Sequence, residues 1–285
     1  MRRDGLLMQA TLKPRGLLSA GGVLDRIVEA KALRLEAAKL ATPQEFLKAQ
    51  AVDASKRDRP RFSEALTRTN RTNIIAEIKH RSPSRGLICE DFDPVRIAGS
   101  YDSGGAAALS VLCEEDFFGG SLDHLKAVRA SVELPLLRKD FIFDEYQQYE
   151  AAAAGAQAVL LIAAILDQEL LGKMLGISAQ LNLDALVEVH SREEMDRAVS
   201  VGAKIIGVNN RDLTTFEVDL NTSIDLASAA PSDVILISES GISSSLEIRR
   251  LMDAGFVAFL IGERFMHAED PGRALRELLD EVGKQ

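Results

Sequence analysis

A carboxylate and an ammonium group lie two residues apart near the end of one short apolar stretch. Residues 73–79 (NIIAEIK) are rich in β-branched side chains, which is typical of a β-strand. Side chains of a strand alternate between its two faces, so Glu77 and Lys79 share one face. The polar turn sequence SPSRG (residues 82–86) follows and ends the strand. On this segment alone, a solvated ion pair on an edge strand is the simpler interpretation.

Polar residues also end further apolar runs of the chain. Lys139 ends the run 135–139 on the face of Leu137, and Glu188 lies in the run 185–189 on the face of Leu186. The other polar residues at such ends are Asn209, Arg211, Glu239 and Ser240. Burying several charges at one rim of a sheet is costly without a function. The recurrence therefore favours an active site, in which an ammonium group can serve as a proton donor.

Two glycine-containing stretches have the composition of a phosphate site. Ser240-Gly241-Ile242 precedes a Ser-rich helix start, and Gly262-Glu263 opens a short helix after the last strand run. Glycine lets backbone N–H groups approach an anion, and the N-terminus of a helix adds positive potential. These stretches follow the seventh and eighth strand runs, where barrels commonly bind phosphate, so they predict a phosphate-binding site.

From residue 74 onward, eight apolar runs alternate with helical patterns. The predicted strands are residues 74–79, 107–112, 135–139, 158–162, 185–189, 204–209, 234–238 and 257–261. The predicted helices are residues 94–103, 122–131, 145–154, 167–181, 192–201, 222–229, 244–254 and 271–282. Eight βα units predict a (β/α)8 barrel, in which active sites lie at the C-terminal ends of the strands.

Small residues separate four of these helices from the next strand, at Gly104-Gly105, Gly155, Gly202 and Gly255. Glycine there permits the left-handed conformation that turns the chain back toward the sheet. A doubly wound open sheet could use similar units. Eight regular units without a Gly-rich dinucleotide turn favour a closed barrel. The predicted fold class is therefore α/β, a single (β/α)8 TIM barrel.

The segment before the first strand divides into an extension and helices. Residues 1–21 lack a periodic apolar face and are expected to form a flexible or loosely docked extension. Residues 22–285 then make up the catalytic barrel with extra N-terminal helices. Residues 23–40 have the spacing of an amphipathic helix, and residues 43–50 form a second helix with Thr42 as its N-cap. Residues 56–60 are a charged linker, and the helices are expected to close one end of the barrel.

Composition limits the functions open to the chain. Its 285 residues, of which 46% are hydrophobic, suffice for one large core. The net charge of −9 and the pI of about 5.1 argue against nucleic acid or an anionic membrane surface as a partner. The cysteines and histidines lack metal-ligand spacing, so no metal is expected, and the sparse cysteines suit a cytoplasmic protein. The longest apolar run, residues 156–166, is too short to cross a membrane, and no signal peptide is recognisable.

Six segments together carry a resemblance to a known family. In chain order they are AEIKHRSPSRG, PLLRKDFIFDEYQ, LVEVH, IGVNNRDL, SESGI and IGERFM. From about residue 23 to its end, the chain resembles the indole-3-glycerol-phosphate synthase family of tryptophan biosynthesis. The combination of RKDFI with VNNRDL is close to diagnostic of that family.

The resemblance implies a carboxy-lyase reaction. In it, 1-(2-carboxyphenylamino)-1-deoxyribulose 5-phosphate closes to indole-3-glycerol phosphate with loss of CO2 and water, and no cofactor is used. In the family's pattern Lys139 is the general acid that protonates the ribulose carbonyl, and Glu188 assists loss of the hydroxyl group. Lys79 is expected to hold the anthranilate carboxylate and also to take part in proton transfer. Glu77 is expected to orient Lys79 and to contact the sugar hydroxyl groups. The resemblance leaves open which lysine serves which step.

The resemblance also implies a set of binding residues. Those that match the polar shell and the phosphate cradle are Asn209, Ser240, Ser82, Gly241, Gly262 and the backbone of Glu263. Those that match apolar walls for the aromatic ring are Phe118 and Phe141. Further candidates for substrate binding are Arg211 and Glu239. Some members have Ser where this chain has Glu263, so the Glu263 side chain is expected to point away from the phosphate.

Two alternatives stay open at this point. Another phosphate-binding barrel of the same pathway group would be expected to use a Cys/Asp or Glu/Asp pair, whereas two lysines with Glu188 are the stronger set here. The second alternative is a non-catalytic barrel that acts as a binding partner, and the presence of Lys79, Lys139 and Glu188 argues against it. A monomer that acts on a phosphorylated small molecule is expected, with a weak dimer as the alternative.

Overall fold

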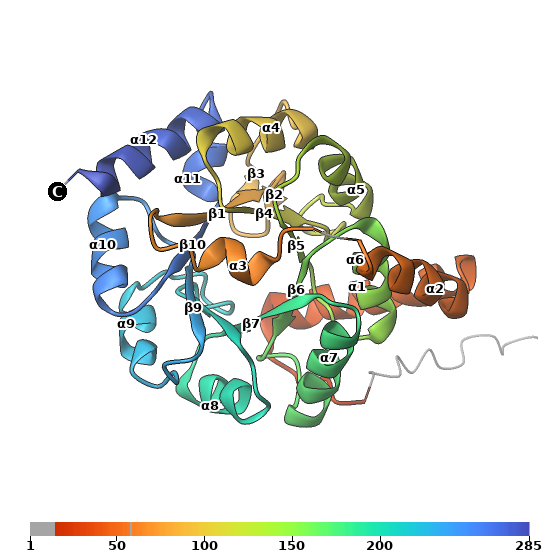
Figure 1. Ribbon diagram of the computed structural model, residues 1–285. Helices are drawn as coiled ribbons and strands as arrows, with labels where there is room; N and C mark the ends of the chain where they lie inside the picture. The colour runs from red at the N-terminus through yellow and green to blue at the C-terminus, as the bar shows by residue number, and fades with distance from the viewer. Residues whose placement is uncertain (1–14, 58, 285) are drawn as a thin grey trace, which may run out of the picture.

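The computed structural model describes residues 15–57 and 59–284, and a closed barrel of parallel strands forms its centre (Figure 1). In chain order the strands are β1 (Asn73–Ile78), β4 (Ala108–Leu112), β5 (Leu136–Lys139), β6 (Ala158–Ile162), β7 (Asp184–Val189), β8 (Ile205–Asn209), β9 (Ile235–Glu239) and β10 (Ala258–Ile261). The barrel closes because β1 pairs with both β4 and β10. The predicted (β/α)8 barrel is confirmed, and each strand boundary lies within one residue of its prediction.

Helices cover the outside of the barrel, one after each strand. They are α4 (Pro94–Gly104), α5 (Leu122–Ser131), α6 (Glu145–Ala154), α7 (Gln168–Gln180), α8 (Arg192–Ser200), α9 (Asn221–Ala227), α10 (Ser245–Asp253) and α12 (Pro271–Gly283). The short helix α11 (Glu263–Met266) precedes α12, as predicted. Figure 1 shows these helices as a ring around the strands. None of the helices in the described part of the chain is long and apolar enough to span a membrane.

The strands are apolar along most of their length because both of their faces are buried. One face fills the barrel interior and the other packs under the helices, so β1, β4, β6 and β8 consist entirely of buried residues. Ile74 and Ile75 point to opposite faces of β1, and both are fully buried. Continuous apolar runs therefore mark the strands in the sequence, and the polar residues at their ends stand out.

Side-chain caps fix where several helices begin. Asp93, Asp144 and Asp270 accept hydrogen bonds from the first backbone N–H groups of α4, α6 and α12. Gly105 (φ 96°) and Gly155 (φ 89°) end α4 and α6 in the left-handed conformation that the sequence predicted. These tight helix ends set the start of each following strand.

The three helices before β1 lie at different places around the barrel. Helix α1 (Gly22–Ala41) reaches the C-terminal end of the strands, where its Lys31 contacts Asp140 just past β5. Helix α2 (Gln44–Ser55) packs against α6. Helix α3 (Phe62–Leu66) covers the opposite end, which faces the viewer in Figure 1. That end is therefore closed by a helix that the sequence did not predict. The two predicted helices lie elsewhere: α1 is at the C-terminal end of the strands and α2 packs against α6.

Some local details differ from the prediction. Thr42 does not cap α2, because its backbone N–H bonds the Ala38 carbonyl at the end of α1 and Pro43 occupies the N-cap position. Helix α3 escapes prediction because its 5 residues are too few to show a helical period. The turn sequence after β1 contains a small antiparallel hairpin of β2 (Arg81–Ser82) and β3 (Gly86–Leu87).

The described part of the predicted N-terminal extension docks on the barrel. The Leu18 N–H donates to the Ile165 carbonyl (2.9 Å), and the Asp167 N–H donates to the Gly16 carbonyl (2.8 Å). Of the two forms expected for the extension, flexible or loosely docked, residues 16–18 adopt the docked one. Residues 1–14 lie outside the described part of the chain, and their order stays a prediction.

Helices α4 and α12 approach each other through glycines, which makes their contact sensitive to a single methyl group. A Cβ atom on Gly104 would lie 2.5 Å from the Gly272 carbonyl oxygen. We expect Gly104→Ala to lower the free energy of unfolding by about 1–3 kcal/mol, because the two helices must move apart. Chemical denaturation measures this change.

Gly176→Ala in α7 is the matched control, since a Cβ atom there meets nothing within 4 Å and alanine favours a helix. A Gly104→Ala protein as stable as Gly176→Ala would show that the contact between α4 and α12 adapts without cost.

Candidate active site

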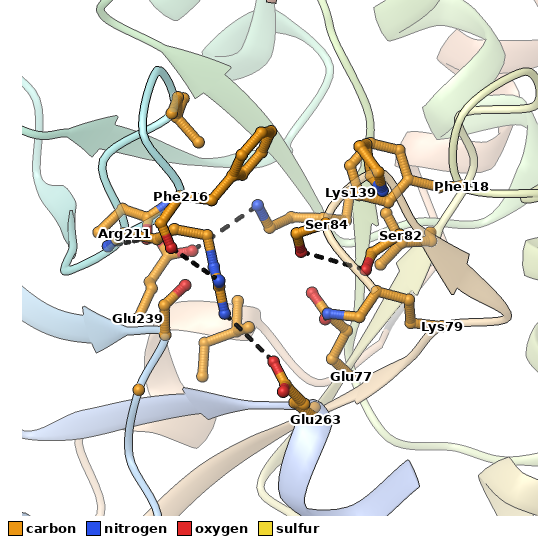
Figure 2. Close-up of a pocket in the computed structure, with 18 of the residues that line it drawn as sticks. Glu77, Lys79, Ser82, Ser84, Phe118, Lys139, Arg211, Phe216, Glu239 and Glu263 are labelled. Atoms are coloured by element: carbon orange, nitrogen blue, oxygen red, sulfur yellow. Dashed lines mark hydrogen bonds and ion pairs between the residues drawn. The ribbon is translucent and has the colours of Figure 1, made fainter. Parts of the chain in front are cut away.

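A cavity of about 650 Å³ opens at the C-terminal ends of the strands. Every residue that the sequence predicted for the site lines it: Glu77, Lys79, Ser82, Phe118, Lys139, Phe141, Glu188, Asn209, Arg211, Glu239, Ser240, Gly241, Gly262 and Glu263. Figure 2 shows the labelled charged side chains converging on this space. The barrel therefore brings together residues that lie far apart in the sequence.

Three carboxyl groups surround the ammonium group of Lys139, the last residue of β5. Its Nζ lies 3.0 Å from Glu188 Oε2 and 3.7 Å from Glu239 Oε2. The third carboxyl group belongs to Glu77, which also accepts a hydrogen bond from Lys79. Glu188 and Glu239 are only 2% and 1% exposed, so water solvates them little. Any negative charge on them must be balanced by the lysines nearby or removed by protonation.

This mutual compensation decides which of the groups are ionised. Burial alone lowers the pKa of Lys139, but the carboxylates around it raise that pKa above its ordinary value. Burial raises the pKa of Glu188, yet Lys139 and His190 bring it below its ordinary value. Glu239 Oε1 has no hydrogen-bond partner among the described residues, and burial raises the pKa of Glu239 to about 8. Near neutral pH, Lys139 and Glu188 are therefore charged and Glu239 is largely neutral.

Aromatic and aliphatic side chains form one wall of the cavity. The ring centroids of Phe118 and Phe141 lie 6.1 Å apart, and the two rings are tilted toward each other by 37°. Helix α1 extends this wall with Val23, Leu24 and Ile27. The sequence predicted α1 as an amphipathic helix but gave no sign that part of its apolar face lines the site.

The chain bends sharply directly after β9. Ser240 (φ 66°) and Gly241 (φ 79°) both adopt left-handed backbone conformations, which for Ser240 is a strained state often found at binding sites. A Cβ atom on Gly241 would lie 2.2 Å from Val218 Cγ1. A Cβ atom on Gly262 would lie 2.6 Å from Glu77 Oε1. Only glycine fits at these two positions, so the backbone itself lines the cavity there.

Asn210 holds this bend from the end of β8. Its Nδ2 donates to the carbonyl groups of Glu239 (2.9 Å) and Ser240 (3.1 Å), and its Oδ1 accepts from Ser223 Oγ (2.7 Å). Asn210 is buried and fully bonded, so its role is to position its neighbours. Sequence reasoning missed that role, although the motif VNNRDL contains the residue.

The Glu263 side chain lines the cavity. Its carboxylate lies between two arginines, 2.9 Å from Arg85 Nη2 and 3.1 Å from Arg211 Nη2, and Figure 2 shows the second of these contacts. The physical reason is charge compensation, since both guanidinium groups enter the same part of the cavity. Arg85 is far more exposed than Arg211 (61% against 21%), so the pair with Arg211 is the stronger one.

A second buried ion cluster lies directly behind Lys139. Asp140, the next residue, is 2.8 Å from Lys31 Nζ of α1 and 2.8 Å from Arg138 Nη2. Burial raises the pKa of Asp140, but these two cations bring it below its ordinary value. The cluster ties α1 to the backbone next to Lys139. Sequence reasoning missed it, although a lysine among the apolar positions of the predicted helix was an available signal.

Fold and cavity together define the class: a (β/α)8-barrel enzyme whose acid–base groups and glycine-lined backbone meet at the C-terminal ends of the strands. Among the residues that the structure describes, no group of three or more His, Cys, Asp or Glu side chains could hold a metal ion.

Solved structures of low sequence identity share the fold. The structure of 3-hexulose-6-phosphate synthase from Salmonella typhimurium matches with a TM-score of 0.60 at 12% identity, over 74% of this chain and 98% of that one. Thiamine phosphate pyrophosphorylase from Pyrococcus furiosus matches with a TM-score of 0.54 at 18% identity, over 74% of this chain and 97% of that one. At such identities the likeness concerns the fold alone.

The chain belongs to the indole-3-glycerol phosphate synthase family. The model of that family matches residues 24–278. An indole-3-glycerol phosphate synthase from Desulfosudis oleivorans is 46% identical over 260 residues, which cover 90% of this chain and 98% of that protein. Another from Chloroherpeton thalassium is 49% identical over 250 residues, or 86% of this chain and 95% of that protein. The resemblance inferred from the motifs is confirmed.

Glu239 makes the stability of the fold depend on pH. Its pKa of about 8 in the folded chain lies above the value of about 4.3 for an unfolded glutamate. Its contribution to stability is therefore fully present below about pH 4 and is lost as the pH rises through about 8. We expect Glu239→Gln, which stays neutral, to raise the melting temperature by several degrees at pH 9 and much less at pH 5. Thermal unfolding at both pH values measures this, and an equal effect at both would show that Glu239 is already ionised at pH 5.

Proposed function

We propose that the cavity catalyses the indole-3-glycerol phosphate synthase reaction, with Lys139 as the general acid. In that reaction 1-(2-carboxyphenylamino)-1-deoxyribulose 5-phosphate closes to indole-3-glycerol phosphate and releases CO2 and water. The observation that carries the proposal is the buried Lys139 ammonium, 3.0 Å from Glu188 and 3.7 Å from Glu239. Such an ammonium can stabilise and protonate an oxygen that becomes negative in the transition state.

The ends of the substrate differ in polarity, and so do the walls of the cavity. The aromatic ring packs against Phe118 and Phe141. The phosphate binds to the backbone at Gly241 and Gly262, where close approach is possible because both residues lack a Cβ atom. The Ser82 hydroxyl, on the loop after β1, completes this cradle.

Polar groups hold the middle of the substrate. Lys79, which Glu77 orients through a hydrogen bond, pairs with the anthranilate carboxylate. Asn209 and Ser240 bond the sugar hydroxyl groups, and Arg211 adds positive charge toward the phosphate end. Binding at both ends and in the middle holds the aromatic carbon close to the ribulose carbonyl, as ring closure requires.

Ring closure needs a proton donor at the carbonyl oxygen. The aromatic carbon that bears the carboxylate attacks the carbonyl carbon, and negative charge develops on the oxygen. Lys139 donates its proton to that oxygen, which becomes a hydroxyl group. Loss of CO2 then restores the aromatic ring.

Dehydration needs a second proton on the same oxygen. Glu188 is ionised while it pairs with the Lys139 ammonium, so it takes up a proton once Lys139 has given up its own. It then donates that proton to the hydroxyl group, and water leaves. The carbon next to nitrogen gives up a proton, and the indole double bond forms. The two acids therefore act one after the other on one oxygen atom.

We propose a cytoplasmic monomer that acts on a small phosphorylated molecule, with a weak dimer as the alternative. The net charge of −9 supports a small phosphorylated substrate in preference to nucleic acid, and the sparse cysteines support a cytoplasmic location.

The absence of tryptophan makes the reaction directly visible by fluorescence. The chain contains no Trp, 3 Tyr and 11 Phe, so an indole product emits at longer wavelength than the protein. We expect the purified protein to raise indole emission when it is mixed with the carboxyphenylamino-deoxyribulose phosphate alone. No indole signal from folded protein between about pH 6 and 9 would overturn the proposal and favour a non-catalytic barrel.

Lys139→Met tests the general acid in the same assay. We expect turnover to fall at least about 10²-fold, because the substitution removes the proton donor and keeps most of the side-chain volume. Lys173→Met is the matched control, since Lys173 lies exposed on α7 and should turn over like the wild type. Turnover above about a tenth of the wild-type rate would contradict the role of Lys139.

Glu188→Gln tests the second acid. The amide cannot donate a proton to the hydroxyl group, so we expect the reaction to stop after ring closure and loss of CO2. Rapid-quench analysis should then show a hydroxylated indoline that has not lost water. If the substrate stayed unreacted, Glu188 would have to act before ring closure.

A further inference from the structure

His190, which directly follows β7, lies between two carboxylates. Its Nδ1 is 3.2 Å from Glu194 Oε2, and its Nε2 is 3.5 Å from Glu188 Oε1. The Nε2 atom is buried and has no hydrogen-bond partner within the described residues. The ring therefore aims an unpartnered nitrogen at Glu188 Oε1, whereas Glu188 Oε2 bonds Lys139.

The start of α8 fixes the orientation of this ring. Glu194 Oε2 accepts the His190 backbone N–H (2.7 Å), and the Glu194 N–H donates to Ser191 Oγ (3.2 Å). A carboxylate can only accept, so the Nδ1 of His190 carries the hydrogen of the bond to Glu194. Nε2 is then the nitrogen that faces Glu188, and its protonation is free to change.

Electrostatics places a proton between His190 and Glu188. Without one, a nitrogen lone pair and a carboxylate oxygen would face each other in a buried space. The charged groups that face His190 from its own and neighbouring elements are Glu188, Glu194, Glu239, Asp212 and, beyond Glu188, Lys139. Burial lowers the pKa of His190, but the bond to Glu194 and the nearby carboxylates raise it above its ordinary value. An imidazolium ion beside an ionised Glu188 places a hydrogen between the two facing atoms and agrees with the raised pKa of His190.

The reaction itself needs a proton from solvent in every turnover. The carbonyl oxygen leaves as water and so takes two protons from the enzyme. The carbon next to nitrogen returns one of them. The substrate carboxylate leaves as neutral CO2, so the second proton must be replaced from outside. Glu188, at 2% exposure, has little access to water, whereas the side chains of His190 and Glu194 are 15% and 16% exposed.

We propose that His190 and Glu188 share one proton, which His190 supplies to Glu188 for the dehydration step and recovers from solvent. The proposal rests on the proposed function, because it assumes that Glu188 protonates the departing hydroxyl group. Once Lys139 has given up its proton, Glu188 loses the charge that stabilised its carboxylate. The bond between His190 Nε2 and hydrogen then breaks as the bond between hydrogen and Glu188 Oε1 forms. The same proton passes to the hydroxyl group, the C–O bond breaks and water leaves.

His190 acts through Glu188 and does not touch the reacting atoms, so it is a positioning residue. Its role predicts a specific pH dependence of kcat. The protonated form of His190 is present below its raised pKa and is lost as the pH rises through it. The wild-type kcat should therefore fall on the alkaline side with a midpoint above about 6.5, the ordinary histidine value.

The test compares His190→Gln with the wild type across pH. We expect His190→Gln to lower kcat on the order of tenfold at neutral pH, with KM within about twofold, and to remove the alkaline fall of kcat. Single-turnover quench experiments should show the hydroxylated indoline accumulating. His124→Gln, the same change at a partly buried position on α5 outside the cavity, should retain both the rate and the pH profile.

Two outcomes would overturn the proposal. One is a kcat of His190→Gln within about twofold of the wild type; the other is an alkaline fall that persists, which would assign the titration to another group such as Glu239. If His190→Gln fails to fold, Glu194→Gln is the deciding variant. Loss of the Glu194 carboxylate should move the midpoint of the alkaline fall of kcat to lower pH. An unmoved midpoint would refute the proposal. Absence of indole product from the wild type would instead refute the proposed function.

Discussion

The site depends on one constraint, which is that the Lys139 ammonium is buried among three carboxyl groups. Removing an ion from water costs several kcal/mol unless oppositely charged partners offset that cost. Additional carboxylates at the same place repel one another, which disfavours their ionised form. Glu188 pairs with Lys139 and stays ionised. Glu239 lies 3.7 Å from Lys139 Nζ, has one oxygen without a partner among the described residues, and is largely neutral near pH 7. Glu77 is balanced separately by Lys79. The cavity therefore holds alternating proton donors and acceptors at little net charge.

Ion pairs and hydrogen bonds around the cavity hold the backbone that carries these charged groups in place. Lys139 lies between the barrel interior and the buried cluster of Arg138, Asp140 and Lys31, so both sides of its strand end are held by ion pairs. Lys31 comes from α1, so this extra helix restrains the strand end in addition to lining the cavity. Asn210 does the same for the bend after β9 through hydrogen bonds alone. Rigid support of this kind is what a site with closely spaced charges requires.

Sequence patterns predicted the barrel and the membership of the site because both follow from local rules. Strands buried on both faces read as apolar runs, and a charge such as Lys139 at the end of a run is conspicuous. The features that escaped depend on pairing between distant segments. In the sequence, Lys31 is only a charged residue among the apolar positions of an amphipathic helix. Its role follows from the ion pair with Asp140, which the sequence does not reveal. The direction of the Glu263 side chain depends on Arg85 and Arg211, which come from two other loops and could not be paired with it from the sequence. Helix α3 is too short to show a helical period in the sequence.

The site also divides its tasks between strands and loops. Glu77, Lys139 and Glu188 belong to β1, β5 and β7, whose backbones are fixed by ladders on both sides. Arg85 and Arg211, by contrast, extend from the loops after β1 and β8, and Glu263 joins them from the start of α11. Proton transfer tolerates errors of only a fraction of an ångström, whereas attraction of a phosphorylated substrate acts over longer distances. Placing the acids on strands and the outer charges on loops gives each task the rigidity that it needs.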